Sequence, residues 1–171
     1  RKDNFLMSKF DVGIIGAGVA GCFAALKIQR KHKLKTIVFD IGRPFSKRRR
    51  QLEGALGCFP NSDGKLYVNN FDKIKELVDG RTAKAANYWV ESALEEASPL
   101  KLIKDNLPAN VLQKRIKEHN FTIKTNDYYQ WKPESIHKFS KIIASDFENS
   151  DYIKFSFDDE VFKILKKNNC F

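Results

Sequence analysis

The feature that most constrains the fold of this chain is a short apolar run followed at once by three closely spaced glycines. Residues 10–25 read FDVGIIGAGVAGCFAA, in which Gly16, Gly18 and Gly21 have the spacing G-x-G-x-x-G. Between a strand and a helix, the first glycine permits a tight turn and the second lets a pyrophosphate approach the backbone. The third lets the helix pack close to the sheet. The run therefore predicts a dinucleotide site at a helix N-terminus.

The residues around the glycines predict a β-α-β unit. Residues 10–15 and 36–39 are short apolar runs typical of buried strands, and residues 19–31 form the helix between them. Parallel strands joined by a helix make a right-handed crossover. The inward face of the predicted helix holds Ala20, Ala24, Ala25 and Ile28.

An acidic residue lies at the end of the second predicted strand, the position where dinucleotide-binding sites have one. Asp40 ends the second predicted strand, 19 positions after Gly21. A carboxylate there accepts hydrogen bonds from a ribose hydroxyl and disfavours a 2′-phosphate. The pattern therefore favours NAD or FAD over NADP, and leaves the choice between NAD and FAD open.

The rest of the chain predicts further elements. Residues 41–70 are expected to be irregular, because glycines and prolines interrupt every period. A short helix capped by Asp72 is expected to end at Gly80. Further helices are predicted over 81–97, over 108–118 and from Pro133, and strands over 121–125, 152–157 and 161–166. The inward residues of the two longer helices are predicted to be Ala83, Ala86, Val90, Ala93, Leu94 and Ala97 in the first, and Ile136, Phe139, Ile143 and Phe147 in the second.

The charge distribution limits the choice of partners. The chain has 171 residues and a net charge of +10, and residues 1–50 hold 13 Lys and Arg against Asp3, Asp11 and Asp40. Lysines and arginines near the end of the first helix complement its dipole. The run KRRR at 47–50 leaves a basic nucleic-acid-binding module as an alternative, although no interleaved aromatic residues support it.

Other site classes find little support. Cys22, Cys58 and Cys170 are too far apart for a zinc motif or a disulfide framework, so no metal is expected. No apolar run reaches the roughly 20 residues that span a bilayer. These features favour a cytoplasmic chain without a membrane span.

A second motif carries a family resemblance. Residues 42–70 read GRPFSKRRRQLEGALGCFPNSDGKLYVNN. This basic, glycine-containing loop ending in SDGKL resembles the FAD-dependent dehydrogenase/oxidoreductase family related to glutathione-reductase-like flavoproteins. The resemblance implies a non-covalently bound FAD and hydride transfer with a small organic substrate, followed by reoxidation by an unknown electron acceptor. It implies no nucleic-acid partner.

The resemblance implies a Rossmann-type FAD/NAD(P)-binding α/β domain with a parallel sheet in three layers. Residues 1–9 would be an N-terminal extension, 10–70 the β-α-β unit with its cofactor loop, and 71–132 a helical insertion. Residues 133–171 would return to the cofactor domain. The turn-forming pair at 168–169 has no returning strand, so we expect a C-terminally incomplete domain that is an N-terminal fragment.

The resemblance also implies roles for particular residues, whereas no catalytic residue is assigned. The pyrophosphate would be held by Gly16, Ala17, Gly18, Ala20 and Gly21. The ribose would be bound by Asp40, and the adenosine and phosphates would lie along Ile41, Gly42, Arg43 and Arg49, with Val161 beside the adenine. The flavin would be approached by Ser62, Asp63, Gly64 and Lys65, and Lys65 would stabilise the anionic reduced form.

Several alternatives remain at this point. The chain could be an NAD-linked dehydrogenase or an inactive flavoenzyme fragment. Cys58 is a candidate redox thiol, although a lone cysteine is more often apolar packing, as is expected of Cys22. Tyr129 and Trp131 are candidates for a substrate wall, and His137 is expected to face solvent.

Overall fold

The protein is described from a computed structural model, which defines residues 9–47, 53–67, 74, 76–96, 98–104, 110–119 and 127–166. The chain divides into two compact units. The first unit comprises residues 1–61 and 140–171, and the second comprises residues 62–139. Each unit contains its own three-stranded sheet.

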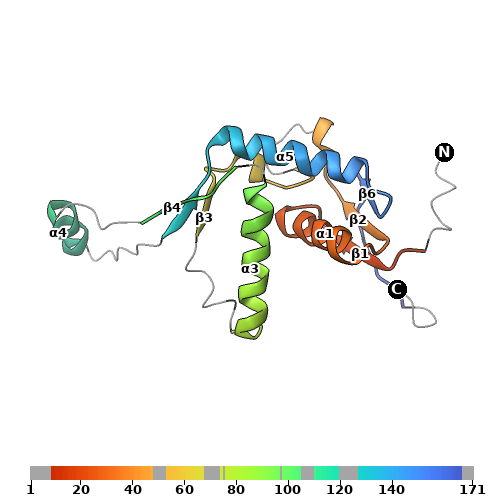
Figure 1. Ribbon diagram of the computed structural model, residues 1–171, viewed down its shortest axis with the longest axis horizontal. Coiled ribbons are helices and arrows are strands. Elements are labelled where there is room, and N and C mark those ends of the chain that lie inside the picture. The colour runs from red at the N-terminus through yellow and green to blue at the C-terminus, as the bar shows by residue number, and fades with distance from the viewer. Residues whose placement is uncertain are drawn as a thin grey trace. The chain divides into compact units, whose positions relative to one another are not determined.

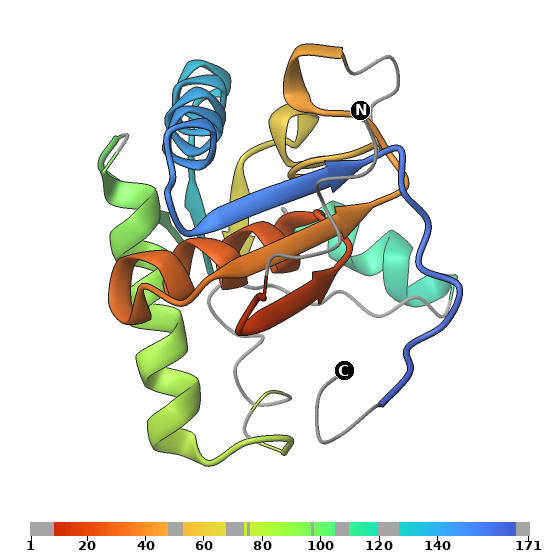
Figure 2. The ribbon, with the colours of Figure 1, turned by 90° about the vertical axis from the view of Figure 1, so that its right-hand side faces the viewer.

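A parallel sheet forms the centre of the first unit. It consists of β1 (Val12–Ile15), β2 (Thr36–Asp40) and β6 (Ile153–Phe157), in the order β1-β2-β6. Helix α1 (Val19–His32) connects β1 to β2. The three arrows run side by side in the same direction in Figure 2. The predicted β-α-β unit is confirmed, as is the predicted strand over 152–157.

The central strand β2 is the most buried of the three. Thr36 and Val38 are fully buried, and Thr36 pairs with Val12 on one side and with Ile153 on the other. β-Branched residues suit this position because they pack well on a pleated surface. Near its end, Phe39 pairs with Ile15 and Ser156 on either side, and Asp40 pairs with Phe157, which fixes the position of Asp40.

Helix α1 buries a different face from the one that its alanines predict. The buried residues are Cys22, Phe23, Ala25 and Leu26. Ala20 and Ala24 are exposed, so the prediction that they point inward was wrong, whereas it was right for Ala25. Burial of Phe23 and Leu26 removes much more apolar surface from water than burial of two alanines would, which favours the observed rotation.

Helix α5 (Pro133–Glu148) confirms its prediction. Its four predicted inward residues, Ile136, Phe139, Ile143 and Phe147, are all buried, and His137 is exposed. The ring of Phe147 lies 4.9 Å from that of Phe155 on β6, measured between centroids. The C-terminal part of α5 therefore covers β6 in the first unit.

The described part of the second unit contains an antiparallel sheet, two whole helices and the N-terminal residues Pro133–Phe139 of α5. The sheet consists of β3 (Lys65–Tyr67), β5 (Tyr128–Gln130) and β4 (Lys101–Ile103), in the order β3-β5-β4. The whole helices are α3 (Gly80–Glu95) and α4 (Asn110–Glu118). Figure 1 labels each of these strands and helices except β5. This sheet was not predicted, because strands of three residues are too short to show an alternating pattern.

Two expectations about the middle of the chain were wrong as a result. Residues 41–70 are not wholly irregular, because they contain β3 and the two 3-10 turns Phe45–Lys47 and Phe59–Asn61. The expected helical insertion over 71–132 contains strands β4 and β5 as well as helices.

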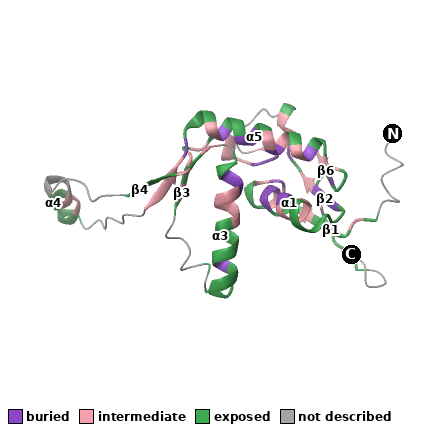
Figure 3. Cartoon of the chain, in the orientation of Figure 1, coloured by how far each residue is buried: buried purple, intermediate pink, exposed green. Residues whose placement is uncertain are grey.

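Helix α3 begins at an effective cap. Asp79 precedes it and accepts hydrogen bonds from the backbone N–H groups of Arg81 and Thr82, so Gly80 opens this helix. The N-terminal half of α3 is largely exposed, whereas most of its C-terminal half is half-buried or buried (Figure 3). Of its predicted inward residues, Ala83, Ala93 and Leu94 are buried, Val90 is half-buried, and Ala86 is exposed, contrary to prediction.

The predicted strand over 161–166 is absent. Asp158 has a φ of +56° and turns the chain away at the end of β6, and residues 161–166 pair with no described strand. The exposed Phe162 and Ile164 produced the apolar pattern. The predicted cap Asp72 and the predicted strand over 121–125 lie outside the described residues, as do Ala97 and the turn at 168–169.

Two classes of feature are absent from the described ranges. No helix there is both long and apolar enough to cross a membrane. The His, Cys, Asp and Glu residues in those ranges form no group of three or more that could hold a metal ion.

Substitution of Gly21 tests the packing of α1. A Cβ atom at this position would lie 1.9 Å from the carbonyl oxygen of Gly16, so Gly21→Ala forces the helix away from the turn. We expect a loss of about 1–3 kcal/mol in the free energy of unfolding, measured by urea denaturation. The matched control is Gly13→Ala, because a Cβ at Gly13 would meet nothing within 4 Å. Equal stability of the two variants would contradict the close approach.

Candidate functional site

The candidate site lies where the carboxyl ends of the three parallel strands meet. The glycine loop follows β1, Asp40 ends β2, and the Asp158–Asp159 turn follows β6. The backbone N–H groups of Asp158 and Asp159 donate to the carbonyl oxygens of Gly42 and Asp40 at 3.0 and 3.1 Å. Ligands of open α/β sheets bind at this edge.

Two of the three glycines in the loop are required by the fold. Gly16 has a φ of +95°, a conformation that favours glycine, and its N–H donates to the carbonyl of Phe39 at 2.7 Å. Gly21 leaves no room for a Cβ beside the carbonyl of Gly16. These contacts explain the tight turn and the close packing of the helix.

Gly18 is different, because neither its conformation nor its neighbours require a glycine. Its φ of −63° and ψ of −173° are open to any residue. A Cβ atom on Gly18 would meet nothing within 4 Å. The surface beside this backbone is therefore open to a bound group that a side chain would displace.

The N-terminus of α1 is suited to an anion. Gly18 is the N-cap residue, no side chain caps the helix, and its first turn holds no acidic residue. The first N–H groups of a helix have no partner within it, and they carry the positive end of its dipole. The described basic residues of α1 gather at its far end, where Arg30, Lys31 and His32 complement the negative end of the dipole.

Asp40 ties the glycine loop to the end of β2. Its Oδ2 accepts from the backbone N–H of Ala17 at 2.5 Å, and its Oδ1 accepts from the N–H of Gly42 at 2.7 Å. An ionised carboxylate has about four acceptor positions, so two bonds leave capacity for a ribose hydroxyl. Asp40 therefore shapes the loop and is also available to a ligand.

A second loop, residues 53–58, is attached to the glycine loop by its backbone. The N–H of Leu56 donates to the carbonyl of Ala17 at 2.7 Å, and Leu56 is fully buried. Gly54 has a φ of +74°, and a Cβ there would lie 1.9 Å from the carbonyl oxygen of Arg43. We did not predict these contacts, although the glycines of the sequence GALG indicate a backbone held in close contact.

The residues that are predicted to border the adenosine differ in their environment. Arg43 places its Nε 3.5 Å from Glu53 and 3.8 Å from Asp158, so its guanidinium is held between two carboxylates. Ile41 is 69% exposed. Val161 is half-buried. Arg49 lies outside the described residues, as do the other arginines of the KRRR run.

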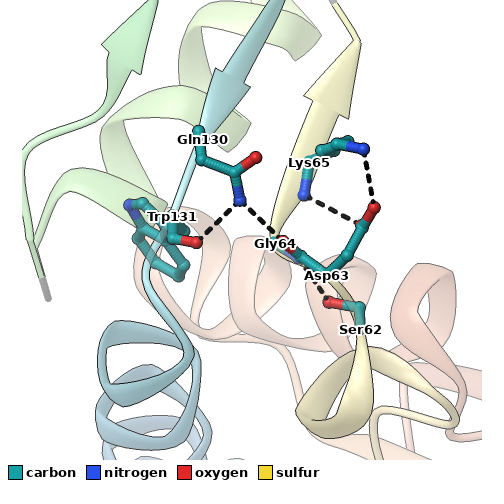
Figure 4. A network of polar contacts seen from close by, with 6 residues as sticks. All are labelled: Ser62, Asp63, Gly64, Lys65, Gln130 and Trp131. Atoms are coloured by element: carbon teal, nitrogen blue, oxygen red, sulfur yellow. Dashed lines mark hydrogen bonds and ion pairs between the residues drawn. The ribbon is translucent and has the colours of Figure 1, made fainter.

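The SDGK sequence forms a closed turn at the start of β3 in the second unit (Figure 4). The Ser62 hydroxyl accepts from the N–H of Gly64, and the Asp63 carboxylate accepts from the N–H of Lys65, both at 3.3 Å. The Lys65 ammonium lies 3.2 Å from the Asp63 carboxylate. This hydrogen-bonded ion pair raises the pKa of Lys65 and lowers that of Asp63.

The same turn is anchored to the end of β5. Gly64 has a φ of +72°, and a Cβ there would lie 2.5 Å from the carbonyl oxygen of Trp131. The N–H of Trp131 donates to the carbonyl of Gly64 at 2.9 Å. The amide nitrogen of Gln130 donates to the carbonyl oxygens of Asp63 and Trp131 at 2.6 and 2.9 Å. Ser62, Asp63 and Gly64 thus each have a structural role in this turn.

Of the two aromatic candidates for a substrate wall, Trp131 belongs to the interior of the second unit and Tyr129 is half-buried. Trp131 is 3% exposed, donates its indole N–H to the carbonyl of Ser98 at 3.2 Å, and packs edge-on against Phe139. Burial raises the pKa of Tyr129, and the neighbouring Glu91 and Glu95 raise it further. Trp131 is a core residue, and Tyr129 faces acidic side chains of α3.

The two described cysteines differ strongly in environment. Cys22 is buried and donates its thiol to the carbonyl of Ala17 at 3.0 Å, and burial raises its pKa to about 12. This confirms Cys22 as a packing residue. Cys58 is exposed, one residue after Gly57.

Comparison with known proteins gives no family. No protein-family model matches the chain, and no curated protein matches it. Among solved structures, the chain is similar to an L-amino acid deaminase from Proteus myxofaciens in complex with anthranilate, with a TM-score of 0.39 and 15% sequence identity. The match covers 95% of this chain and 41% of the deaminase chain. A similarity of this strength assigns neither a family nor a function.

Substitution of Asp40 tests its structural role. Asp40→Ala leaves the N–H groups of Ala17 and Gly42 without their acceptors, and such losses at a charged acceptor typically cost about 1.5–3 kcal/mol. We expect a loss of that size in the free energy of unfolding. Asp40→Asn keeps one acceptor oxygen and should lose less. An unchanged urea midpoint in Asp40→Ala would contradict the tie between β2 and the loop.

Thiol accessibility tests the two cysteine environments. In a Cys170→Ser background, Cys58 should react rapidly with a chromogenic thiol reagent at mildly alkaline pH, because it is exposed. Cys22 should react only after unfolding, because it is buried and its pKa is about 12. Two rapidly reacting thiols in the native protein would show that Cys22 is accessible.

Proposed function

We propose that the first unit binds FAD and that the chain belongs to an FAD-dependent oxidoreductase. The observation that carries the proposal is Gly18: neither its backbone conformation nor any neighbouring atom excludes a side chain, and a bound pyrophosphate needs a bare backbone there. The uncapped N-terminus of α1 and the Asp40 carboxylate supply the two further parts that a dinucleotide needs.

The proposed binding roles follow the geometry of the first unit. The N–H groups at the start of α1, from Gly18 through Ala20 to Gly21, would donate to the pyrophosphate. Asp40 would accept from a ribose hydroxyl through the positions left free by Ala17 and Gly42. The backbone of Ile41 to Arg43 and that of Val161 would border the adenosine. The proposal that Ser62, Asp63, Gly64 and Lys65 contact the flavin rests on the family resemblance.

FAD is preferred over NAD because of the loop that follows β2. Residues 53–58 return to the glycine loop and bind it through Leu56, as the long loop of the resembling flavoproteins would require. When bound, the flavin supplies hydride transfer to or from an organic substrate. The residues of this unit would bind and orient the cofactor.

Dinucleotide titration tests the proposal. We expect the chain to bind FAD more tightly than NAD, measured by the change in FAD fluorescence and by calorimetry. Gly18→Ala should weaken FAD binding about tenfold or more, because the added methyl group would occupy the space proposed for a phosphate. Tenfold in affinity corresponds to about 1.4 kcal/mol of binding free energy. The variant should remain folded and lose no more than about 1 kcal/mol in the free energy of unfolding, because a Cβ there meets nothing and only the N-cap preference is lost.

The control for this titration is Gly13→Ala, which adds the same methyl group to β1 in open space. It should bind FAD like the parent. Equal FAD affinity of the parent and Gly18→Ala would contradict the proposed pyrophosphate site. Tighter binding of NAD than of FAD would favour the NAD-linked alternative.

A further inference from the structure

One face of the sheet in the second unit has a composition that its fold does not require. Side chains alternate across a strand, and the observed register places Lys65, Gln130 and Lys101 in one row across β3, β5 and β4. Tyr67, Tyr128 and Ile103 form the next row on the same side. We call these six residues the Lys–Tyr face.

The contacts within this face hold Lys65 in a defined position. Its Nζ lies 3.2 Å from the carboxylate of Asp63 and 5.4 Å from the centroid of the Tyr128 ring. An ammonium group has three donors, so these two contacts leave capacity for a further acceptor. The ion pair and the aromatic ring therefore orient the ammonium before any ligand arrives.

Lys101 supplies a second positive charge. It is exposed, it lies across Gln130 from Lys65, and no carboxylate in the described part of the chain lies within ion-pair distance of it. Two strand spacings separate the two lysine backbones, roughly 10 Å. Their long side chains can therefore reach a single carboxylate between them.

The adjacent row provides an aromatic surface. The rings of Tyr67 and Tyr128 lie 5.9 Å apart with their planes tilted by 59°, and Tyr67 is 42% exposed. Tyrosine rings offer a large contact area at low cost in side-chain entropy. A flat ring can therefore lie beside them while its acidic group reaches the lysines.

The opposite face of the same sheet carries no lysine and lies near two carboxylates. It carries Leu66, Tyr129 and Leu102, and Tyr129 lies near Glu91 and Glu95 of α3. An anion is disfavoured on that side and favoured on the Lys–Tyr face. The sheet therefore distinguishes its two sides by charge.

We propose that the Lys–Tyr face binds a small aromatic carboxylate, with the carboxylate between Lys65 and Lys101 and the ring against Tyr67 and Tyr128. As a binding site it uses no residue of the first unit, and it gives Lys65 a different ligand from the flavin that the family resemblance implies. As the substrate class of the oxidoreductase, it rests on the function proposed above.

Binding of benzoate to the full chain tests this assignment, with affinities taken from chemical-shift titration. Benzoate carries both the ring and the charge, acetate has the charge alone, and benzamide has the ring alone. We expect benzoate to bind at least tenfold more tightly than either. Equal binding of acetate and benzoate, or no benzoate binding by the folded chain, would overturn the proposal.

Matched variants locate the site. Lys101→Gln and Tyr67→Leu should each weaken benzoate binding at least fivefold. Lys104→Gln removes the same charge from an exposed residue just after β4 and should leave the affinity unchanged. Equal loss in Lys101→Gln and Lys104→Gln would reduce the effect to general electrostatic attraction and overturn the proposal.

Two further titrations distinguish this site from the proposed cofactor site. Gly18→Ala should keep the parent affinity for benzoate, and Lys101→Gln should keep the parent affinity for FAD. Failure of FAD binding with benzoate binding intact would count against the proposed function alone. Competitive displacement of benzoate by FAD would assign the face to the flavin and overturn the proposal.

Discussion

The contact on which the first unit depends is the approach of α1 to the turn that precedes it. The backbone of Gly21 lies so close to the carbonyl of Gly16 that no side chain fits between them. This contact sets the distance between the helix and β1, and therefore the direction in which the first N–H groups of α1 point. The placement of the helix N-terminus beside the Gly16 turn and the open surface at Gly18 both depend on it. A helix packed further away would present its N-terminus elsewhere.

Asp40 connects this contact to the rest of the site. Its carboxylate joins the glycine loop to the chain after β2, and the backbone of Gly42 joins that segment to the turn after β6. Leu56 adds a fourth segment by its bond to Ala17. Four segments distant in sequence are thus held together mostly by backbone hydrogen bonds, which depend little on side-chain identity. A glycine or an acidic residue is needed only where the backbone or a carboxylate must come close.

This explains how much of the structure the sequence predicts. The β-α-β unit follows from a local pattern, in which a strand, three glycines, a helix and an acidic residue occur within some 30 positions. The burial of Ile136, Phe139, Ile143 and Phe147 follows from one helical period. The rotation of α1 does not follow, because it depends on how much surface Phe23 and Leu26 bury against distant segments. The sheet of the second unit could not be predicted either. Strands β3, β4 and β5 are stabilised by pairing with one another, and three residues are too few to show a strand pattern.

The candidate site divides in the same way. Gly16, Gly21 and Asp40 could be placed from spacing, because their roles are set within the β-α-β unit. Leu56 and Gly54 could not, since their partners Ala17 and Arg43 lie far away in the sequence. The SDGK sequence shows the converse case. Its serine, aspartate and glycine close a turn, so their presence is explained by the fold, whereas the lysine is held above Tyr128 with a donor to spare. The SDGK turn, which resembles a cofactor-binding motif, thus holds the Lys65 ammonium group in a defined position. What that ammonium binds is decided by the aromatic row beside it and by Lys101 across the sheet.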